Sequence, residues 1–175
     1  PGEAGFDFHD IGFGAEAVWQ WAPQVQALRR AGHRVVVPNL LWFGESTSTN
    51  RDFSLDHQLA VVLALLDRLG VAQADVVGIS YGGLVAYGLA GMAPDRVGKL
   101  VILDSPGAVY TDDDYAGMLV RFGMTHPGSL LVPSDPSGVQ ALVDLAYFRP
   151  PLLIRLLRRQ IIDALYANDR DERIA

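Results

Sequence analysis

The spacing of apolar residues predicts two well-marked helices in the first part of the chain. Leucine and valine recur at helical spacing over residues 55–69, between a favourable N-cap at Ser54 and a glycine past the end at Gly70. A second helix, rich in small residues, is expected over 84–90 and should end before Pro94. The first helix therefore has two recognisable ends and an apolar face, and the second has a recognisable end.

Short apolar or β-branched runs alternate with the helices and predict buried strands. Between the first two runs a further helix is expected, with Pro23 in its first turn and Gly32 closing it. Alternation of strands and helices is typical of a mostly parallel sheet with helices on both faces, which makes the fold class α/β. The predicted strands are residues 6–11, 34–38, 74–77 and 100–103.

The pattern changes after residue 107. Apolar residues there follow helical spacings that prolines interrupt, and β-branched runs are missing, so several short helices are expected. We therefore divide the chain into a core over 1–107 and a helical segment over 108–175. The run Asp112-Asp113-Asp114 is interpreted as a solvated helix start.

Composition limits the classes of partner. The 175 residues are 50% hydrophobic and 19% charged, enough for one domain with a core or one domain with an insertion. With a net charge of −6 and no basic cluster, we expect no nucleic-acid partner. We also expect no membrane association, because no apolar run approaches the ~18 residues of a membrane span. The chain has no cysteine, and a cytoplasmic location is our expectation.

The stretch 76–83, Val-Val-Gly-Ile-Ser-Tyr-Gly-Gly, predicts a strand, a sharp turn and a helix start with Ser80 at the apex. In such a Gly-x-Ser-x-Gly turn, a side chain on Gly78 or Gly82 would collide with the neighbouring strand or helix. The helix that follows offers backbone N–H groups in its first turn, where an oxyanion could bind. We interpret Ser80 as a nucleophile; an ordinary N-cap serine is the alternative.

Four stretches taken in order resemble the α/β-hydrolase fold family, whose members include serine hydrolases with a helical cap. Residues 9–15 are similar to the family's oxyanion loop, 38–46 to its Pro-Asp-Leu-x-Gly-x-Gly-x-Ser turn, 78–83 to its nucleophile elbow, and 94–104 to the link and strand that follow. Residues 108–175 would correspond to the cap. The sequence departs from the family pattern at Asp10, Asn39 and Trp42, where glycine, aspartate and glycine are usual.

The resemblance implies a serine hydrolase that acts on an ester or other acyl substrate without a cofactor or a metal. Ser80 would attack the carbonyl, and the backbone N–H groups of Tyr81 and Ile11, or alternatively Gly12, would hold the oxyanion. An uncharged substrate with an apolar portion is expected. Aromatic and methionine side chains that could line its pocket, or simply belong to the core, are Trp19, Trp21, Trp42, Phe43, Met118, Phe122, Met124 and Phe148.

The remaining members of a catalytic triad are not evident. His9, His33 and His57 precede Ser80, whereas the family's order is nucleophile, acid, histidine, and His126 lies in the cap segment. Asp104 is a candidate acid; an aspartate that caps a strand exit is the alternative. We expect the base and two further strands beyond Ala175, and little or no activity from this chain alone.

Two other functions remain open at this level. A non-catalytic protein on the same scaffold could hold an apolar ligand without turnover. The sequence Gly12-x-Gly14-x-x-Ala17 also approximates a dinucleotide-binding turn, although the ribose-binding position then carries Asn39 in place of an acid.

Overall fold

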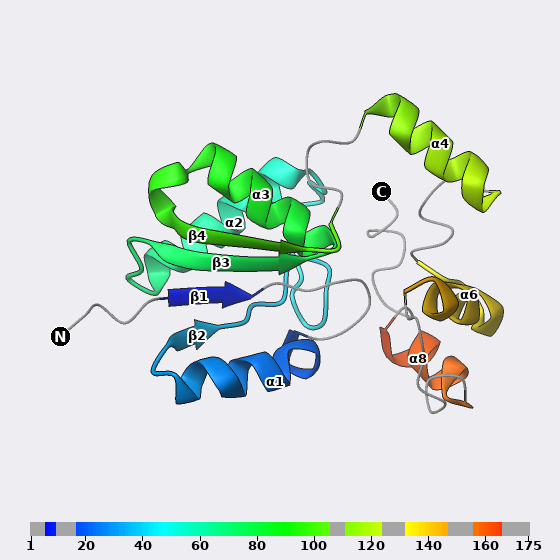
Figure 1. The fold of residues 1–175 in the computed structure, drawn as a ribbon, viewed down its shortest axis with the longest axis horizontal. Helices are drawn as coiled ribbons and strands as arrows, with labels where there is room; N and C mark the ends of the chain where they lie inside the picture. Colours follow the sequence, from blue (N-terminus) through cyan, green and yellow to red (C-terminus); the bar gives the residue numbers. More distant parts are fainter. Residues whose placement is uncertain (1–5, 10–16, 106–110, 124–131, 147–155, 166–175) are drawn as a thin grey trace. The chain divides into compact units, whose positions relative to one another are not determined.

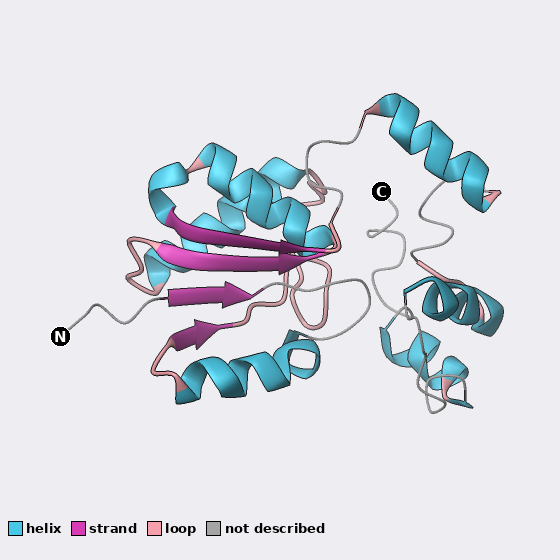
Figure 2. Cartoon of the chain, in the orientation of Figure 1, coloured by secondary structure: helices cyan, strands magenta, loops and turns pink. Residues whose placement is uncertain are grey.

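The computed structural model of the chain describes residues 6–9, 17–105, 111–123, 132–146 and 156–165. The chain divides into two compact units, residues 1–109 and 110–175, and each is described by itself. The first unit holds the sheet and the elbow at Ser80. The second contains only helices within its described residues (Figure 2).

A parallel sheet of four strands forms the centre of the first unit (Figure 1). In the sheet they lie in the order β2-β1-β3-β4, and all three neighbouring pairs run parallel. The strands are β1 (Phe6–His9), β2 (Arg34–Val36), β3 (Ala74–Ile79) and β4 (Val97–Leu103).

Each connection between successive strands contains a helix. These are α1 (Ala17–Arg30), α2 (Leu55–Arg68) and α3 (Tyr81–Met92), which is followed by the short helix η1 (Pro94–Arg96). The chain moves from β1 to β2 in one direction across the sheet, and from β2 to β3 and on to β4 in the other. Because such crossovers are right-handed, α1 covers one face and α2 and α3 the other. The predicted α/β class with helices on both faces is confirmed.

The core of this unit lies where α2 and α3 pack on the sheet. Leu66 of α2 and Leu89 of α3 are completely buried, and Val76 of β3 lies in the same cluster. A Cβ placed on Gly88 would stand 3.1 Å from the Leu59 side chain, so the glycine permits close approach of the two helices. The N-cap at Ser54 is confirmed, because its hydroxyl accepts a hydrogen bond from the N–H of His57.

Two boundaries differ from the sequence prediction. Helix α1 begins at Ala17, so Pro23 lies inside the helix and not in its first turn. Proline removes one helical hydrogen bond. Trp21, two residues earlier, is only 4% exposed, and burial of its large side chain opposes that loss. Strand β2 ends at Val36, two residues before the predicted exit.

Strand β4 is partly exposed. It begins at Val97, three residues earlier than expected, and Leu100, Val101 and Leu103 are 36%, 47% and 41% exposed. It ends the strand order and has one neighbouring strand among the described residues. Strand β2 ends the order on the other side, and there the expectation of a buried strand is wrong, because Arg34 is exposed and Val35 and Val36 are half-buried. An apolar run identifies a strand but not how many neighbours cover it.

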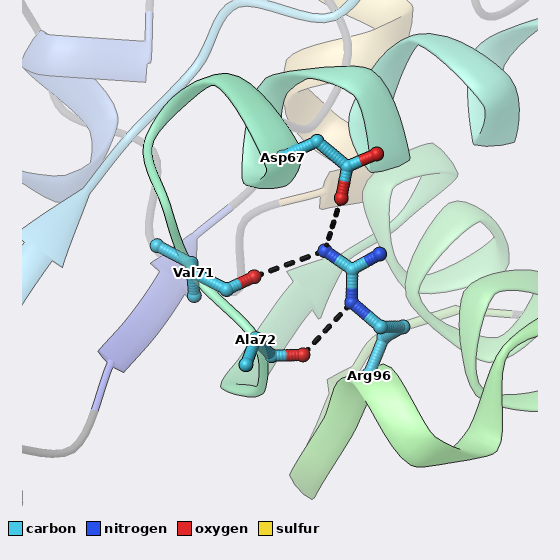
Figure 3. A network of polar contacts seen from close by, with 4 residues as sticks. All are labelled: Asp67, Val71, Ala72 and Arg96. Carbon is cyan, nitrogen blue, oxygen red and sulfur yellow. Dashed lines mark hydrogen bonds and ion pairs between the residues drawn. The ribbon is translucent and has the colours of Figure 1, made fainter.

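Arg96 joins three segments at the amino ends of β3 and β4 (Figure 3). Its guanidinium donates from Nε to the carbonyl of Ala72 at 2.8 Å and from Nη2 to the carbonyl of Val71 at 2.9 Å. Nη2 also lies 2.7 Å from Oδ1 of Asp67, near the end of α2. One side chain thus fixes the end of α2 and the turn before β3 against η1.

The second unit contains α4 (Asp112–Phe122), α6 (Pro136–Ala146) and α8 (Arg158–Leu165), of which α6 and α8 pack together. The predicted helix start at Asp112 is confirmed. Thr111 and Asp114 bond reciprocally as a capping box, and these hydrogen bonds lower the pKa of the Asp114 carboxyl. No helix within the described residues is long and apolar enough to cross a membrane. That this segment is a cap remains a prediction.

Candidate active site

Ser80 occupies the turn between β3 and α3 with an unusual backbone conformation. Its φ is 54° and its ψ is −122°, outside the regions that serine ordinarily adopts. Its N–H donates to the carbonyl of Leu103 at 3.0 Å, which ties the turn to the end of β4. Its side chain makes no capping bond to α3, so the N-cap alternative does not explain the residue. This strained strand-to-helix turn is the geometry of a nucleophile elbow.

Glycines around the turn are required because neighbouring atoms approach their backbone closely. A Cβ on Gly78 would collide with the backbone carbonyl of Gly82, and a Cβ on Gly83 would collide with the Ser105 side chain. The predicted steric role of Gly78 is thus seen in the structure. Gly83, which the sequence argument did not single out, matters because the chain after β4 crosses close to it.

The position of Ser80 in the sheet is typical of a ligand site. Crossover direction reverses between β1 and β3, and in open α/β sheets ligands bind outside the carboxyl ends of the strands at such a point. Ser80 directly follows β3, and β1 ends beside that strand, with His9 paired to Val77. The carboxyl end of β1 therefore lies beside the strand that leads to Ser80.

Of the predicted oxyanion donors, only Tyr81 lies within the described residues. It is the first residue of α3, where a backbone N–H has no acceptor four residues earlier in the helix. Ile11 and Gly12, like Asp10 and the start of the dinucleotide-like pattern, fall in 10–16, outside the described residues. Both assignments remain predictions.

The loop between β2 and α2 places aromatic side chains against the elbow. The ring of Phe43 stacks on that of Tyr81, with centroids 5.8 Å apart and planes at 25°. Trp42 packs on Phe53 at 5.1 Å and has a φ of 71°. This is a position where the family usually has glycine, so the tryptophan adopts a conformation that glycine would hold without strain. Of the proposed pocket residues, Trp21, Trp42 and Phe43 are buried, and Met118 is half-buried.

The remaining pocket candidates, Trp19, Phe122, Met124 and Phe148, have side chains outside the described set. Their assignment is therefore untested.

Gln58 is a component of this region that the sequence interpretation missed. It is 4% exposed, and its side-chain amide bonds to both backbone groups of Leu41. A signal was present in the sequence, because Gln58 falls on the apolar stripe formed by Leu55, Leu59 and Val62. A polar residue on a buried stripe needs hydrogen-bond partners.

Asp104 follows β4 and also has a positive φ, of 43°. Its carboxylate is exposed and has no hydrogen bond or ion pair to any described residue. It lies at the same edge of the sheet as Ser80, since the two strands are parallel and Leu103 bonds to the serine's N–H. Its role as the acid remains a prediction.

The histidines do not complete a triad within the described residues. Nε2 of His57 is buried and bonded to none of the groups that the structure describes, so it makes no hydrogen bond to Ser80. His33 follows α1 and His9 ends β1, at opposite ends of the sheet's strands, and His126 lies outside the described residues. The described portion of the chain also contains no cluster of three carboxylates or histidines that could hold a metal ion.

Comparison with known proteins identifies relatives. The family model for the alpha/beta hydrolase fold matches residues 12–125. 2-Hydroxymuconate semialdehyde hydrolase of Pseudomonas sp. (strain CF600) is 37% identical over 107 residues, covering 58% of this chain and 36% of that protein. Bifunctional epoxide hydrolase 2 of Sus scrofa is 30% identical over 93 residues, covering 52% of this chain and 17% of that protein.

Solved structures agree on the fold. A meta-cleavage product hydrolase from Pseudomonas fluorescens IP01 superposes with a TM-score of 0.74 at 23% identity, covering 98% of this chain and 60% of that one. An enol-lactonase from Burkholderia xenovorans LB400 gives a TM-score of 0.66 at 22% identity, covering 98% and 62%. The chain thus spans roughly a sixth to three fifths of the length of these relatives. By the extent of the family match and the architecture around Ser80, it belongs to the alpha/beta hydrolase fold family.

Proposed function

We propose that this chain carries the nucleophile of a serine hydrolase, and that Ser80 forms an acyl-enzyme with an ester or other acyl substrate. The observation that supports this most is the backbone of Ser80, which has a φ of 54° and a ψ of −122° between β3 and α3. Serine gains nothing structurally from this conformation, because its hydroxyl caps nothing. Strain of this kind persists where it has a functional use.

In the proposed reaction, Ser80 Oγ bonds to the substrate's carbonyl carbon while a histidine accepts the hydroxyl proton. The bond to the leaving group breaks as that histidine returns the proton to it. Water then attacks the acyl-enzyme, again with the histidine as base, and releases the acid and Ser80. Backbone N–H groups of Tyr81 and Ile11, with Gly12 as the alternative to Ile11, stabilise the oxyanion; losing one such donor costs about 3 to 4 kcal/mol of barrier in a comparable enzyme.

The isolated chain should be a weak catalyst or inactive. His57 does not bond to Ser80, and the chain spans only 36% of the first relative and 60% of a solved neighbour. We therefore propose that the histidine comes from sequence following residue 175, with Asp104 or a later carboxylate as the acid. The names of two relatives specify a semialdehyde hydrolase and an epoxide hydrolase and not an esterase. An ester or other acyl compound with an apolar portion remains our proposed substrate class, on the strength of the serine nucleophile.

Turnover of a p-nitrophenyl ester tests the proposal in a chain extended through the coding sequence that follows residue 175. Replacing Ser80 by alanine should lower kcat by about 10⁴-fold or more, because a lost nucleophile is not replaced by other groups. The control is Ser134→Ala, an exposed serine of the second unit, which should leave kcat unchanged. Full activity in Ser80→Ala would overturn the assignment. An extended wild-type chain without turnover that retains an apolar ligand would favour the non-catalytic alternative.

A further inference from the structure

Among the described residues, Gln58 is the one polar side chain that is less than a tenth exposed. Its Oε1 accepts from the N–H of Leu41 at 3.2 Å, and its Nε2 donates to the carbonyl of Leu41 at 3.0 Å. Both halves of the amide are thus used on one residue of the loop between β2 and α2. An amide is suited to this task because it carries a donor and an acceptor side by side.

The loop that Gln58 holds is unusually buried for a connection. Four consecutive residues from Leu40 to Phe43 are each at most 8% exposed. Their backbone groups need partners inside the protein. Trp42 donates to the carbonyl of Ser46 at 2.8 Å and Phe43 to that of Leu40 at 3.1 Å, whereas Leu41 relies on Gln58. We call Gln58 and its two hydrogen bonds to Leu41 the clamp. It lies beside Trp42, the residue with the strained φ of 71°.

This loop reaches the elbow through Phe43. Its ring stacks on Tyr81, whose backbone N–H is the proposed oxyanion donor next to Ser80. Phe43 is 5% exposed and belongs to the same apolar cluster against which Tyr81 packs. A series of contacts thus runs from Gln58 through Leu41 and the tight turn to Phe43, and from there to the first residue of α3.

We propose that Gln58 is a positioning residue, which fixes the conformation of residues 40–43 and thereby holds Tyr81 and its peptide in place at the elbow. The catalytic meaning of this role rests on the proposed function, whereas the positioning of Tyr81 does not. Gln58 touches neither substrate nor Ser80 in this account. It acts through the loop.

The substitution Gln58→Glu turns the clamp into a pH-dependent one. A protonated carboxyl has one O–H donor and one acceptor and can replace the amide, but a carboxylate cannot donate to the carbonyl of Leu41. Burial beside that carbonyl should raise the pKa of the new carboxyl above its usual value of about 4.3. The clamp should then be intact below the unfolded pKa and be lost as the pH rises through the folded pKa.

The test follows the backbone amide signals of Leu41, Trp42 and Tyr81 by NMR in the 175-residue chain. In Gln58→Glu, these three signals should match wild type at low pH and move together as the carboxyl ionises. In Gln58→Leu they should be displaced at every pH. The matched control is Gln73→Glu, because Gln73 is exposed and also donates its amide to a backbone carbonyl, that of Asp95. It should leave Tyr81 unchanged.

Other titratable groups lie near Gln58, and they are the same in wild type and in every variant. His57 follows next to Gln58 in α2, Asp56 precedes it, Asp52 lies close to His57, and Glu45 belongs to the loop. The measure is therefore the difference between each variant and wild type at the same pH. If Gln58→Leu does not fold, Phe43→Leu removes only the stack and should move the Tyr81 signal while leaving Leu41 in place.

Labelling of Ser80 by a fluorophosphonate gives the functional readout. With the elbow loosened, the labelling rate in Gln58→Leu should fall by roughly tenfold to a hundredfold, as expected for small misplacements of reacting groups. An unmoved Tyr81 amide in folded Gln58→Leu would overturn the positioning role. If wild type itself is never labelled at Ser80, the proposed function fails, and the amide signals still decide the role of Gln58.

Discussion

The two ends of the parallel sheet differ in how their turns are built. At the amino ends of β2 and β3, the residues with positive φ are Gly32 and Gly70, and Arg96 ties the neighbouring segments together. At the carboxyl ends, the positive-φ residues are Trp42 and Gly44 after β2, Ser80 after β3 and Asp104 after β4. Trp42, Ser80 and Asp104 are the non-glycine residues with positive φ among those that the structure describes.

This contrast separates stability from chemistry along the strands. Glycine holds a positive φ at no steric cost, so the amino-end turns are relaxed. Tryptophan, serine and aspartate in such conformations each cost of order 1 to 3 kcal/mol, which the surrounding packing must offset. Strain is thus concentrated at the end of the sheet where parallel α/β folds bind ligands. Substitutions at the amino end should therefore change stability without changing the labelling rate of Ser80. At the carboxyl end, replacing the strained Ser80 by glycine should raise stability and abolish labelling.

The largest effect is expected from Gly78→Ala. The added methyl would collide with the carbonyl of Gly82, and this backbone atom cannot move without displacing the elbow. We expect the free energy of unfolding to fall by about 3 kcal/mol or more, as for other severe steric changes. The matched control is Gly91→Ala in α3, the helix that follows the elbow, where a Cβ meets nothing within 4 Å. That change should be neutral or stabilise by up to about 1 kcal/mol. Urea unfolding followed by circular dichroism measures both, and equal stabilities would refute the steric argument.

An intermediate effect is expected from Arg96→Leu at the amino end. It removes two hydrogen bonds to the carbonyls of Val71 and Ala72, and we expect a loss of about 1 to 3 kcal/mol. The ion pair between the exposed Lys99 and the half-buried Asp75, 3.6 Å apart, provides a control, since Lys99→Met should change stability by less than about 0.5 kcal/mol. The fluorophosphonate labelling rate of Ser80 in folded Arg96→Leu should equal that of wild type. A slower rate would show that the two ends are not separable.

The smallest effect is expected from removing a side chain at the carboxyl end and adding one at the amino end. Ser80→Gly removes the strained side chain and should raise stability by about 1 kcal/mol or less, because glycine also gains entropy in the unfolded chain. Gly32→Ala has open space around the new Cβ but a φ of 92°, so it should lower stability by about 1 kcal/mol. Thermal unfolding of both variants measures the pair. Changes of the same sign in both would contradict the assignment of strain to the carboxyl end.

The sequence was sufficient for features that depend on neighbouring residues. The cap at Ser54 and the elbow around Ser80 follow from short-range sterics and hydrogen bonds, and the parallel order follows from alternating elements. Features set by distant contacts could not be predicted in the same way. The start of α1 before Pro23 accompanies the burial of Trp21, and the exposure of β4 depends on its place in the sheet.

For the candidate site the same distinction holds. Ser80 could be identified because its motif is contiguous, whereas the partnership of Gln58 with Leu41 joins residues 17 apart in sequence. The strain at Trp42 is also invisible in the sequence, since a departure from a family pattern does not state a backbone angle. The catalytic roles of Ser80, Tyr81, Ile11, Gly12 and Asp104 stay predictions.

The most direct test of the central claim is the pH dependence of Ser80 labelling in the 175-residue chain. A fluorophosphonate is applied across a range of pH, the adduct is located by peptide mapping, and Ser80→Ala serves as the blank. If Ser80 is the nucleophile and its histidine is missing here, one slow adduct should form at Ser80. Its rate should rise about tenfold per pH unit, because hydroxide must act as the base. An adduct elsewhere, or none at Ser80 in alkaline solution, would contradict the nucleophile. Rapid labelling that levels off above about pH 7 would contradict the missing histidine.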